Sequence, residues 1–208
     1  MKLFGGQRYP EDVARRVPPG QRLVKGWPVL HVGPIPSFDE AEWDFTLSGL
    51  VEREVTMTYA ELKALPNVTV DADMHCVTGW TTLDNAWEGV SFRTLVDLCR
   101  PRPEAKWVVT HCDHSYTSNL SLEAMLDDDV LVAWANRGEL LTLEHGFPLR
   151  LVVPKRYAWK SAKWLRGLEF TDTNRRGFWE ERGYHVHGDP WPEERYSYQE
   201  GPRDELRP

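Results

Sequence analysis

The residues with the clearest chemical potential surround Cys76, in the segment Met74-His75-Cys76-Val77-Thr78-Gly79-Trp80. A cysteine thiolate is a soft ligand for transition metals, and it needs an open, partly polar site near cationic groups. A strand that ends in a loop containing Gly79 offers such a site. Cysteine is also often a small buried hydrophobe, so Cys76 by itself does not decide between a metal ligand and a core residue.

A second group of candidates lies downstream, where His145, Arg150, Lys160 and Lys163 form the most cationic stretch of the chain. Arg150 can hold a phosphate through two parallel hydrogen bonds, whereas the lysines act as point charges. The aromatic residues between them favour a packed site, although the charges alone would equally suit a solvated basic loop. Together with Cys76, this stretch predicts a metal carried on an anionic organic cofactor. ATP and NAD are disfavoured because the Gly-rich patterns of their binding loops are absent.

A third candidate is the segment His111-Cys112-Asp113-His114, whose residue types suit zinc. Structural zinc normally takes four ligands from Cys or His pairs at fixed spacing, and no such pair is present. Neighbouring side chains on a strand also point to opposite faces, so only alternate members could share one metal. A zinc site using His111, Cys112 and His114 is therefore a weak hypothesis, and a polar cleft edge near Tyr116 is the alternative.

The strand that carries Cys76 is predicted by hydrophobic periodicity. Val68, Val70, Ala72 and Met74 alternate with polar residues, which is typical of a half-buried strand that ends at Cys76. Further strands are expected at 43–56, 107–110, 130–136, 149–153 and 165–171.

Short helices are expected between these strands. Thr58 and Glu61 form a capping box at the start of one helix, Ser91 can cap a second, and Ser121 a third. Cys99 falls on the apolar face of the second helix and is predicted to be a core residue. Many strands with short helices between them indicate an α+β fold with mixed, largely antiparallel sheets.

The chain divides by composition into three parts. Residues 1–40 are rich in Pro, Gly and charge and are expected to form an extended N-terminal arm, anchored by Trp27, Val29 and Leu30. Residues 41–176 hold the predicted strands and helices. Residues 177–208 are rich in aromatic residues and Pro without regular periodicity, so they are expected to pack as a tail on the domain.

Bulk properties narrow the class of protein. The 208 residues carry 25 Lys and Arg against 32 Asp and Glu, for a net charge of -7, which argues against a general nucleic-acid binder. No apolar run reaches the length of a membrane span, and no signal peptide is recognised, so a cytoplasmic location is expected. The odd count of 3 Cys is a poor disulfide framework, which leaves a thiol free to bind metal.

Taken together, several segments resemble the molybdopterin-binding domain of the sulfite oxidase superfamily. The likeness spans residues 25–172 and extends to small bacterial sulfite oxidase-like oxidoreductases and the catalytic subunit of protein-methionine-sulfoxide reductase. Sulfite oxidase proper also has a haem domain and a dimerisation domain, and neither is expected here. The matching segments are His75-Cys76-Val77-Thr78-Gly79-Trp80, Trp87-Glu88-Gly89-Val90, Tyr116-Thr117-Ser118-Asn119-Leu120, His145-Gly146-Phe147-Pro148-Leu149-Arg150 and Lys160-Ser161-Ala162-Lys163-Trp164.

The resemblance implies a mononuclear molybdenum on a pyranopterin dithiolene (Mo-molybdopterin), with Cys76 as its thiolate ligand. It further implies that His145 and Arg150 hold the pterin and its phosphate. A loop formed by Ser161, Ala162 and Lys163 would close over that phosphate. His31 and Cys112 fall where the arm and a central strand of the family reach the cofactor.

The expected function is two-electron oxygen-atom transfer on a small oxo-acceptor or sulfoxide-like substrate, because the cofactor carries that chemistry. Tyr116, His111 and Arg156 are the candidates for the substrate side. A separate electron-transfer partner is expected, since no second redox motif is visible. A non-catalytic carrier of the cofactor and, less favoured, a structural zinc protein are the alternatives.

Overall fold

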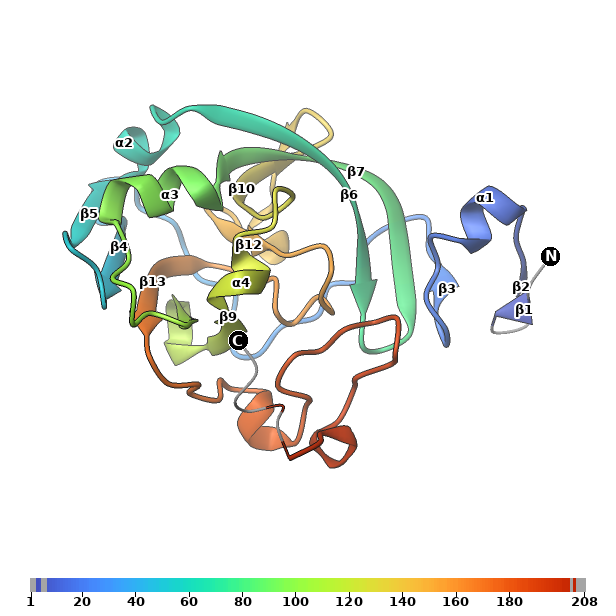
Figure 1. Cartoon of the computed structure of the whole chain (residues 1–208). Coiled ribbons are helices and arrows are strands. Elements are labelled where there is room, and N and C mark those ends of the chain that lie inside the picture. The colour runs from blue at the N-terminus through green and yellow to red at the C-terminus, as the bar shows by residue number, and fades with distance from the viewer. Residues whose placement is uncertain (1–2, 5–6, 203, 205–208) are drawn as a thin grey trace.

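The computed structural model describes residues 3–4, 7–202 and 204. Its described part forms two packed sheets with short helices at their edges (Figure 1). The first sheet contains β3 (Arg22–Leu23), β6 (Asn67–Cys76), β7 (Trp80–Ser91), β10 (Leu131–Asn136), β11 (Glu139–Leu140) and β12 (Arg150–Val152). The second contains β4 (Asp44–Gly49), β5 (Val55–Thr58), β8 (Trp107–Cys112), β9 (Thr117–Ser121) and β13 (Leu165–Thr171).

Most strand pairs are antiparallel; the parallel ones are β3 with β7 and β4 with β13. A separate small hairpin joins β1 (Leu3–Phe4) and β2 (Gln7–Arg8). The helices are α1 (Glu11–Ala14), α2 (Tyr59–Lys63), α3 (Phe92–Cys99) and α4 (Leu122–Met125), with single 3-10 turns η1 to η4 at Asp113–Ser115, Leu143–His145, Glu180–Arg182 and Ser197–Gln199. The predicted mixed α+β class is confirmed.

The predicted helix starts are confirmed. The Thr58 hydroxyl accepts from the Glu61 N–H, while the Glu61 carboxylate accepts from the Thr58 N–H, which completes the capping box of α2. Ser91 caps α3 and Ser121 caps α4 through their hydroxyl oxygens. The helix α3 stops at Arg100, whose φ of 52° is left-handed, directly before Pro101.

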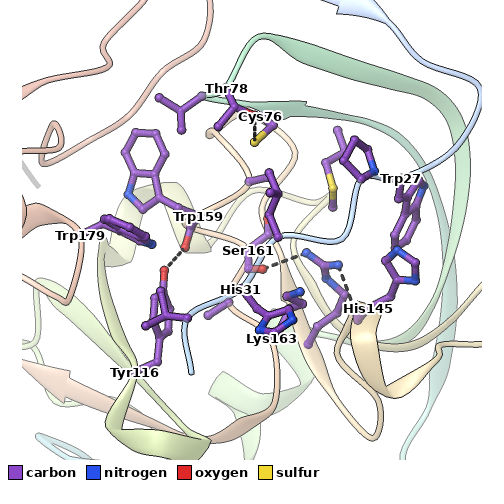
Figure 2. A pocket seen from close by; sticks show the side chains of 18 of the residues that line it. Trp27, His31, Cys76, Thr78, Tyr116, His145, Trp159, Ser161, Lys163 and Trp179 are labelled. Carbon is purple, nitrogen blue, oxygen red and sulfur yellow. Dashed lines mark hydrogen bonds between the residues drawn. The ribbon is translucent and has the colours of Figure 1, made fainter. Parts of the chain in front are cut away.

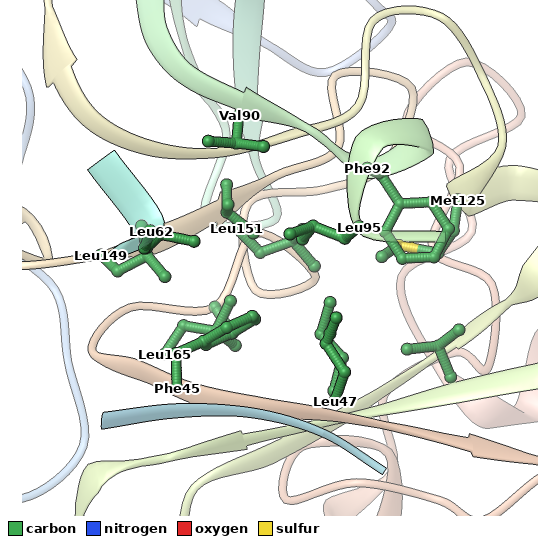
Figure 3. Close-up of a cluster of buried hydrophobic side chains, with 14 of the residues drawn as sticks. Phe45, Leu47, Leu62, Val90, Phe92, Leu95, Met125, Leu149, Leu151 and Leu165 are labelled. Carbon is green, nitrogen blue, oxygen red and sulfur yellow. The ribbon is translucent and has the colours of Figure 1, made fainter. Parts of the chain in front are cut away.

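The main core lies between the two sheets, where Phe45 and Leu47 of β4 face Val90 of β7 and Leu151 of β12 (Figure 3). Cys99 is fully buried in this core, as its place on the apolar face of α3 predicted. Two of the predicted site residues belong to the first sheet, Cys76 as the last residue of β6 and Arg150 as the first residue of β12.

The strand β7 was not predicted, although it is the longest in the described chain and pairs with β6 from Trp80 to Val90, with one register shift. Its central residues Asp84 and Asn85 interrupt the hydrophobic alternation, and Asp84 has a positive φ of 57°. Asn85 is fully buried. Its side chain amide forms hydrogen bonds with Asn136 and with the Thr82 carbonyl, which offset the cost of burying it. Tertiary hydrogen bonds thus stabilise a strand that periodicity alone does not show.

The N-terminal arm is only partly extended, because the helix α1 interrupts it, whereas β3 is an extended part of it that pairs with β7. Trp27 packs against Trp87, with ring centroids 5.0 Å apart, as expected of an anchor. Val29 and Leu30 were predicted as anchors too, but they are 42% and 49% exposed, so that prediction was wrong. No helix in the described residues is long and apolar enough to cross a membrane.

The C-terminal tail begins beside β9, where the Phe178 N–H donates to the Thr117 carbonyl. Gly177 fits there because an added Cβ would lie 2.5 Å from the Ser118 Cα. The tail then returns toward the C-terminal end of β6, as the red ribbon in Figure 1 shows. Residues 203 and 205–208 of this predicted segment lie outside the described residues.

Candidate functional site

A cavity of about 330 Å³ opens where the arm, the end of β6, the loop after β12 and the C-terminal tail meet (Figure 2). Its size is within the range of small-molecule sites. The predicted site residues in its lining are His31, Cys76, Tyr116, His145, Arg150, Ser161, Ala162 and Lys163.

Cys76 ends β6 at the edge of this cavity and is 7% exposed. Its sulfur lies 3.2 Å from the Thr78 hydroxyl. The chain then turns back into β7 through Gly79, whose φ of +89° is in the region that favours glycine. Burial raises the pKa of the thiol, while the bond to Thr78 opposes that shift. A protonated thiol here becomes a good ligand only when a metal takes the place of its proton.

The cationic end of the cavity is built around Arg150 in β12. Its guanidinium donates to the His145 carbonyl at 3.1 Å and to the Ser161 carbonyl at 2.9 Å. The same group lies over the ring of Trp27 at 5.7 Å and of Trp87 at 5.2 Å. Burial lowers the pKa of Arg150 to about 10, which still leaves it charged at neutral pH.

Lys163 lies beside Arg150, and its ammonium donates to the Glu144 carbonyl at 2.7 Å. Burial and the nearby Arg150 lower the pKa of Lys163 to about 7. Gly146 allows this close approach, because an added Cβ would meet both Arg150 and Lys163 at 3.1 Å. The charged guanidinium of Arg150 and the partly protonated amine of Lys163 are thus held side by side.

The lining of the cavity contains no carboxylate, and neither Arg150 nor Lys163 forms an ion pair within the part of the chain that the structure describes. Two adjacent desolvated cations are costly unless an anion compensates them. The donor set, a forked guanidinium with an ammonium, matches a phosphate. This end of the cavity therefore fits the anionic part of a cofactor.

The other predicted cofactor residues complete that end. The Nδ1 of His145 lies 2.9 Å from the Thr142 hydroxyl, and its ring packs edge-on against Trp27 at 4.8 Å. Burial lowers the pKa of His145, which favours the neutral ring. Ser161 accepts from the Val153 N–H, so its hydroxyl holds the loop in place. His31 is exposed at the mouth, beside Trp164.

The opposite end of the cavity is aromatic and contains Tyr116, Trp159, Trp179 and Tyr184 (Figure 2). Tyr184 lies between the two tryptophans, with ring centroids 5.1 Å from Trp159 and 5.0 Å from Trp179. The Tyr116 hydroxyl donates to the Trp159 carbonyl at 2.9 Å, and burial raises its pKa well above 10. Three of these aromatic residues, Trp159, Trp179 and Tyr184, were not predicted as site residues. The visible signals were the aromatic residues of the basic stretch for Trp159 and the aromatic content of the tail for the other two.

Lys160 does not line the cavity, contrary to the prediction. Its side chain is fully buried, and its ammonium forms an ion pair with Glu180 at 2.5 Å and donates to Asn119. The charge of Lys160 is thus used to hold the tail against β9. A basic residue near a cofactor motif need not face the cofactor, because the sequence does not show its distant carboxylate partner.

The other predicted residues that do not line the cavity are His111, Cys112 and Arg156. His111 bonds to Glu169 of the neighbouring strand β13, at 2.8 Å. Cys112 packs in the main core, where burial raises its thiol pKa. Arg156 lies 3.8 Å from Asp189 of the tail. Their assignment to the substrate or cofactor therefore finds no support in the lining.

The zinc alternative also lacks support. Within residues 3–4, 7–202 and 204, no three His, Cys, Asp or Glu side chains come together in a way that could hold a metal ion. His111 and Cys112 point to opposite faces of β8, as the alternation of a strand requires.

Comparison with known proteins agrees with this geometry. The family described as "Oxidoreductase molybdopterin binding domain" matches residues 32–179. The chain is 42% identical to the uncharacterized oxidoreductase YuiH of Bacillus subtilis, across 94% of this chain and 100% of that protein. It is 31% identical to a putative protein-methionine-sulfoxide reductase subunit, YedZ1, of Azospira oryzae, across 72% of this chain and 57% of that protein.

Among solved structures, the sulfane dehydrogenase SoxCD of Paracoccus pantotrophus superimposes with a TM-score of 0.62. The match covers 80% of this chain and 54% of that chain at 23% identity, so it supports the fold alone. The family match and the Bacillus relative together span nearly the whole sequence. The chain therefore belongs to the oxidoreductase molybdopterin-binding domain family and is a molybdopterin-dependent oxidoreductase of the sulfite oxidase type.

Proposed function

We propose that the cavity binds Mo-molybdopterin and that the protein catalyses two-electron oxygen-atom transfer on a small substrate. The proposal rests on the pair Arg150 and Lys163, which line the same cavity as Cys76. The lining of that cavity contains no carboxylate that could compensate their charge. A phosphate would compensate those charges, and a metal would take the proton's place on the thiol. The basic residues and the thiol line the same cavity, so a single ligand that carries both a phosphate and a metal would bind both.

In this proposal Arg150 and Lys163 hold the phosphate, and the neutral ring of His145 faces the pterin. Ser161 and Ala162 supply the rigid loop, since the Leu151 N–H donates to the Ala162 carbonyl at 2.8 Å. Cys76 provides the thiolate from the fixed end of β6. When bound, the cofactor supplies the two-electron exchange that accompanies transfer of an oxygen atom.

The balance of the reaction defines what the protein needs besides the cofactor. In the reductive direction the substrate loses one oxygen, and two electrons and two protons convert that oxygen to water. The electrons are proposed to come from a separate electron-transfer partner. The names of relatives from Azospira oryzae and Campylobacter jejuni, which describe a subunit and a catalytic subunit, support such a partner.

The test combines metal analysis with cofactor extraction from the purified protein. Stoichiometric molybdenum, together with a fluorescent pterin after oxidation, is the expected result. A redox titration then separates an enzyme from a carrier, because a carrier would leave the metal unchanged when reductant and oxo-substrate are added. Zinc in place of molybdenum, or protein without pterin after expression in a host that makes the cofactor, would disprove the assignment.

A further inference from the structure

The sulfur of Cys76 has a hydrogen-bond partner within its own turn. The Thr78 hydroxyl lies 3.2 Å from the sulfur, and the dashed line beside Cys76 in Figure 2 marks this contact. The backbone N–H of Thr78 is a second donor to the same atom. No hydrogen bond to this sulfur from another residue is found in the part of the chain that the structure describes. The polar contacts of the thiol thus come from Thr78.

The backbone of the turn holds Thr78 in this place. The Gly79 N–H donates to the Cys76 carbonyl at 2.9 Å, which closes a four-residue turn with Thr78 at its third position. Threonine is branched at Cβ and therefore stiff at its first side-chain torsion, which limits the directions open to its hydroxyl. Among the described residues, that hydroxyl has no other hydrogen-bond partner. The contact with the sulfur is therefore its function in this turn.

The strength of this contact depends on the state of the sulfur. Thr78 lines the cavity and is exposed, whereas Cys76 is 7% exposed. A hydroxyl beside a neutral thiol forms a weak hydrogen bond, because the S–H group is a weak donor and its sulfur a weak acceptor. A thiolate is an acceptor alone, so the hydroxyl must donate to it, and a bond to an ionised group is about twice as strong. The hydroxyl therefore has its largest effect when a metal replaces the proton of Cys76.

We propose that Thr78 is a positioning residue for the sulfur of Cys76 and that it raises the reduction potential of the metal which this sulfur would bind. A hydrogen bond withdraws electron density from a thiolate, so the sulfur donates less charge and the reduced, more electron-rich metal is stabilised. Hydrogen bonds to sulfur tune the potentials of blue-copper and iron–sulfur sites in proteins. The inference rests on the proposed cofactor and adds a residue that controls how readily the metal accepts electrons from the partner.

Two substitutions separate the hydroxyl from the shape of the side chain. Thr78→Val keeps the branched shape and removes the hydroxyl, whereas Thr78→Ser keeps the hydroxyl and removes the methyl group. Both variants are expected to fold, since Thr78 is exposed. The matched control is Thr56→Val in β5. Thr56 is also exposed and bonds to one side chain, that of Thr46 at 3.0 Å, but it does not line the cavity.

The first measurement uses cofactor-free protein, in which Raman spectroscopy records the S–H stretching band of Cys76. The band is assigned by its absence in Cys76→Ser, which retains the bands of Cys99 and Cys112. In Thr78→Val the band is expected to move to the frequency of a thiol without a hydrogen bond, whereas Thr78→Ser and Thr56→Val should keep the wild-type frequency. An unshifted band in Thr78→Val would show that the hydroxyl does not bond to the sulfur, which would overturn the inference.

The second measurement is a redox titration of the loaded protein with mediator dyes, followed by the thiolate-to-metal absorption. In Thr78→Val the reduced metal should be disfavoured about tenfold, which lowers the potential of a one-electron step by about 59 mV. The absorption should also move to longer wavelength, because the electrons of the sulfur are held less tightly. Thr78→Ser should recover most of both shifts, and Thr56→Val should show neither.

The outcomes separate this inference from the proposed function. A wild-type potential in Thr78→Val at full molybdenum content would overturn the inference and leave the proposed function intact, and any loss of stability in that variant would then reflect a structural role of the turn alone. Wild-type protein without molybdenum would instead refute the proposed function, and the effect of Thr78 on the potential with it.

Discussion

The guanidinium of Arg195 donates a hydrogen bond to the carbonyl oxygen of Val77, the residue that follows Cys76. From the other end of the chain, the Gln21 amide donates to the Cys76 carbonyl at 3.1 Å, and the Arg22 N–H donates to the Gly79 carbonyl at 3.0 Å. The turn that carries the thiol is therefore held by Gln21 and Arg22 of the arm and by Arg195 of the tail, all three outside residues 32–179. These contacts make Gln21 and Arg195 positioning residues for Cys76.

Replacing Arg195 with Ala should loosen this turn without unfolding the protein. A lost charge-assisted bond to a backbone carbonyl costs about 1–3 kcal/mol. Because Arg195 also lowers the pKa of Cys76, the rates are compared at a pH high enough to ionise the thiol in every variant. Under that condition the alkylation rate of Cys76 by iodoacetamide in cofactor-free protein, followed by peptide mass spectrometry, is expected to rise severalfold, and Gln21→Leu should act in the same direction. Cys99, which is fully buried, serves as the unreactive internal standard. Arg93→Ala is the matched control, because Arg93 is exposed and pairs with Asp128 at the surface. Equal rates in all these proteins would show that the turn is held without either contact.

Replacing Cys76 with Ser should leave the fold intact but remove the metal–thiolate bond. A hydroxyl is a harder and much less acidic ligand than a thiol. The visible absorption of the thiolate–metal bond is expected to disappear, and molybdenum content to fall. Cys99→Ala should instead lower the free energy of unfolding by about 1–3 kcal/mol, because Cys99 fills the main core. A changed metal spectrum in Cys99→Ala, with an unchanged one in Cys76→Ser, would contradict the assignment.

Replacing Arg150 with Ala should yield folded protein with little cofactor. Loss of one partner of a buried charge pair costs about 2–5 kcal/mol, since the anion is left unpaired. Arg150→Lys should recover little, because one ammonium does not replace a planar, two-pronged donor. Lys155→Ala is the control from the same basic stretch, since Lys155 is 59% exposed and pairs with Asp127. Extracted pterin, measured by fluorescence, gives the result; full occupancy in Arg150→Ala would count against the phosphate assignment.

Lys163 predicts a pH dependence of anion binding in cofactor-free protein. Burial and Arg150 lower its pKa to about 7, so the ammonium is present below that pH and is lost above it. Sulfate, which does not titrate in this range, should bind more weakly as the pH rises through about 7. The same depression of the pKa means that the unfolded chain binds the proton more tightly, so this group makes the protein more stable as pH rises from about 7 to 10.5. Lys163→Met should abolish both trends, which calorimetry with sulfate and urea unfolding can measure. An unchanged pH dependence in that variant would assign both to another group.

The sequence was sufficient to place Cys76, because the alternation of β6 is local and ends at that residue. It also predicted the helix starts, since each cap depends on residues three positions apart. The aromatic end of the cavity could not be predicted from such local patterns. Tyr184 reaches Trp159 only through the path of the tail, which has no periodicity to read. The strand β7 was not predicted for a related reason. It depends on buried hydrogen bonds of Asn85 with residues distant in the sequence, such as Asn136.

Lys160 illustrates the same limit for charges and leads to the last prediction. Sequence alone shows a lysine inside a cofactor motif, whereas the structure pairs it with Glu180 from the tail, both side chains being 0% exposed. Glu180 also accepts hydrogen bonds from the Trp159 indole and from the Ser118 hydroxyl. It therefore links the tail to the aromatic end of the cavity and to β9.

Replacing Glu180 with Ala should therefore destabilise the protein by about 3–5 kcal/mol, because it leaves the Lys160 ammonium buried without a partner. Replacing both residues, as Lys160→Met with Glu180→Leu, should recover much of that loss, since an apolar pair leaves no buried charge. Glu181→Ala is the control, because Glu181 follows Glu180 in the chain and its side chain is 64% exposed. Urea unfolding of the wild type, Lys160→Met, Glu180→Leu and the double variant measures the coupling between the two side chains. If Lys160 instead held the cofactor, the double variant would fold stably but lose its pterin, whereas a purely structural pair predicts that a stable double variant keeps it.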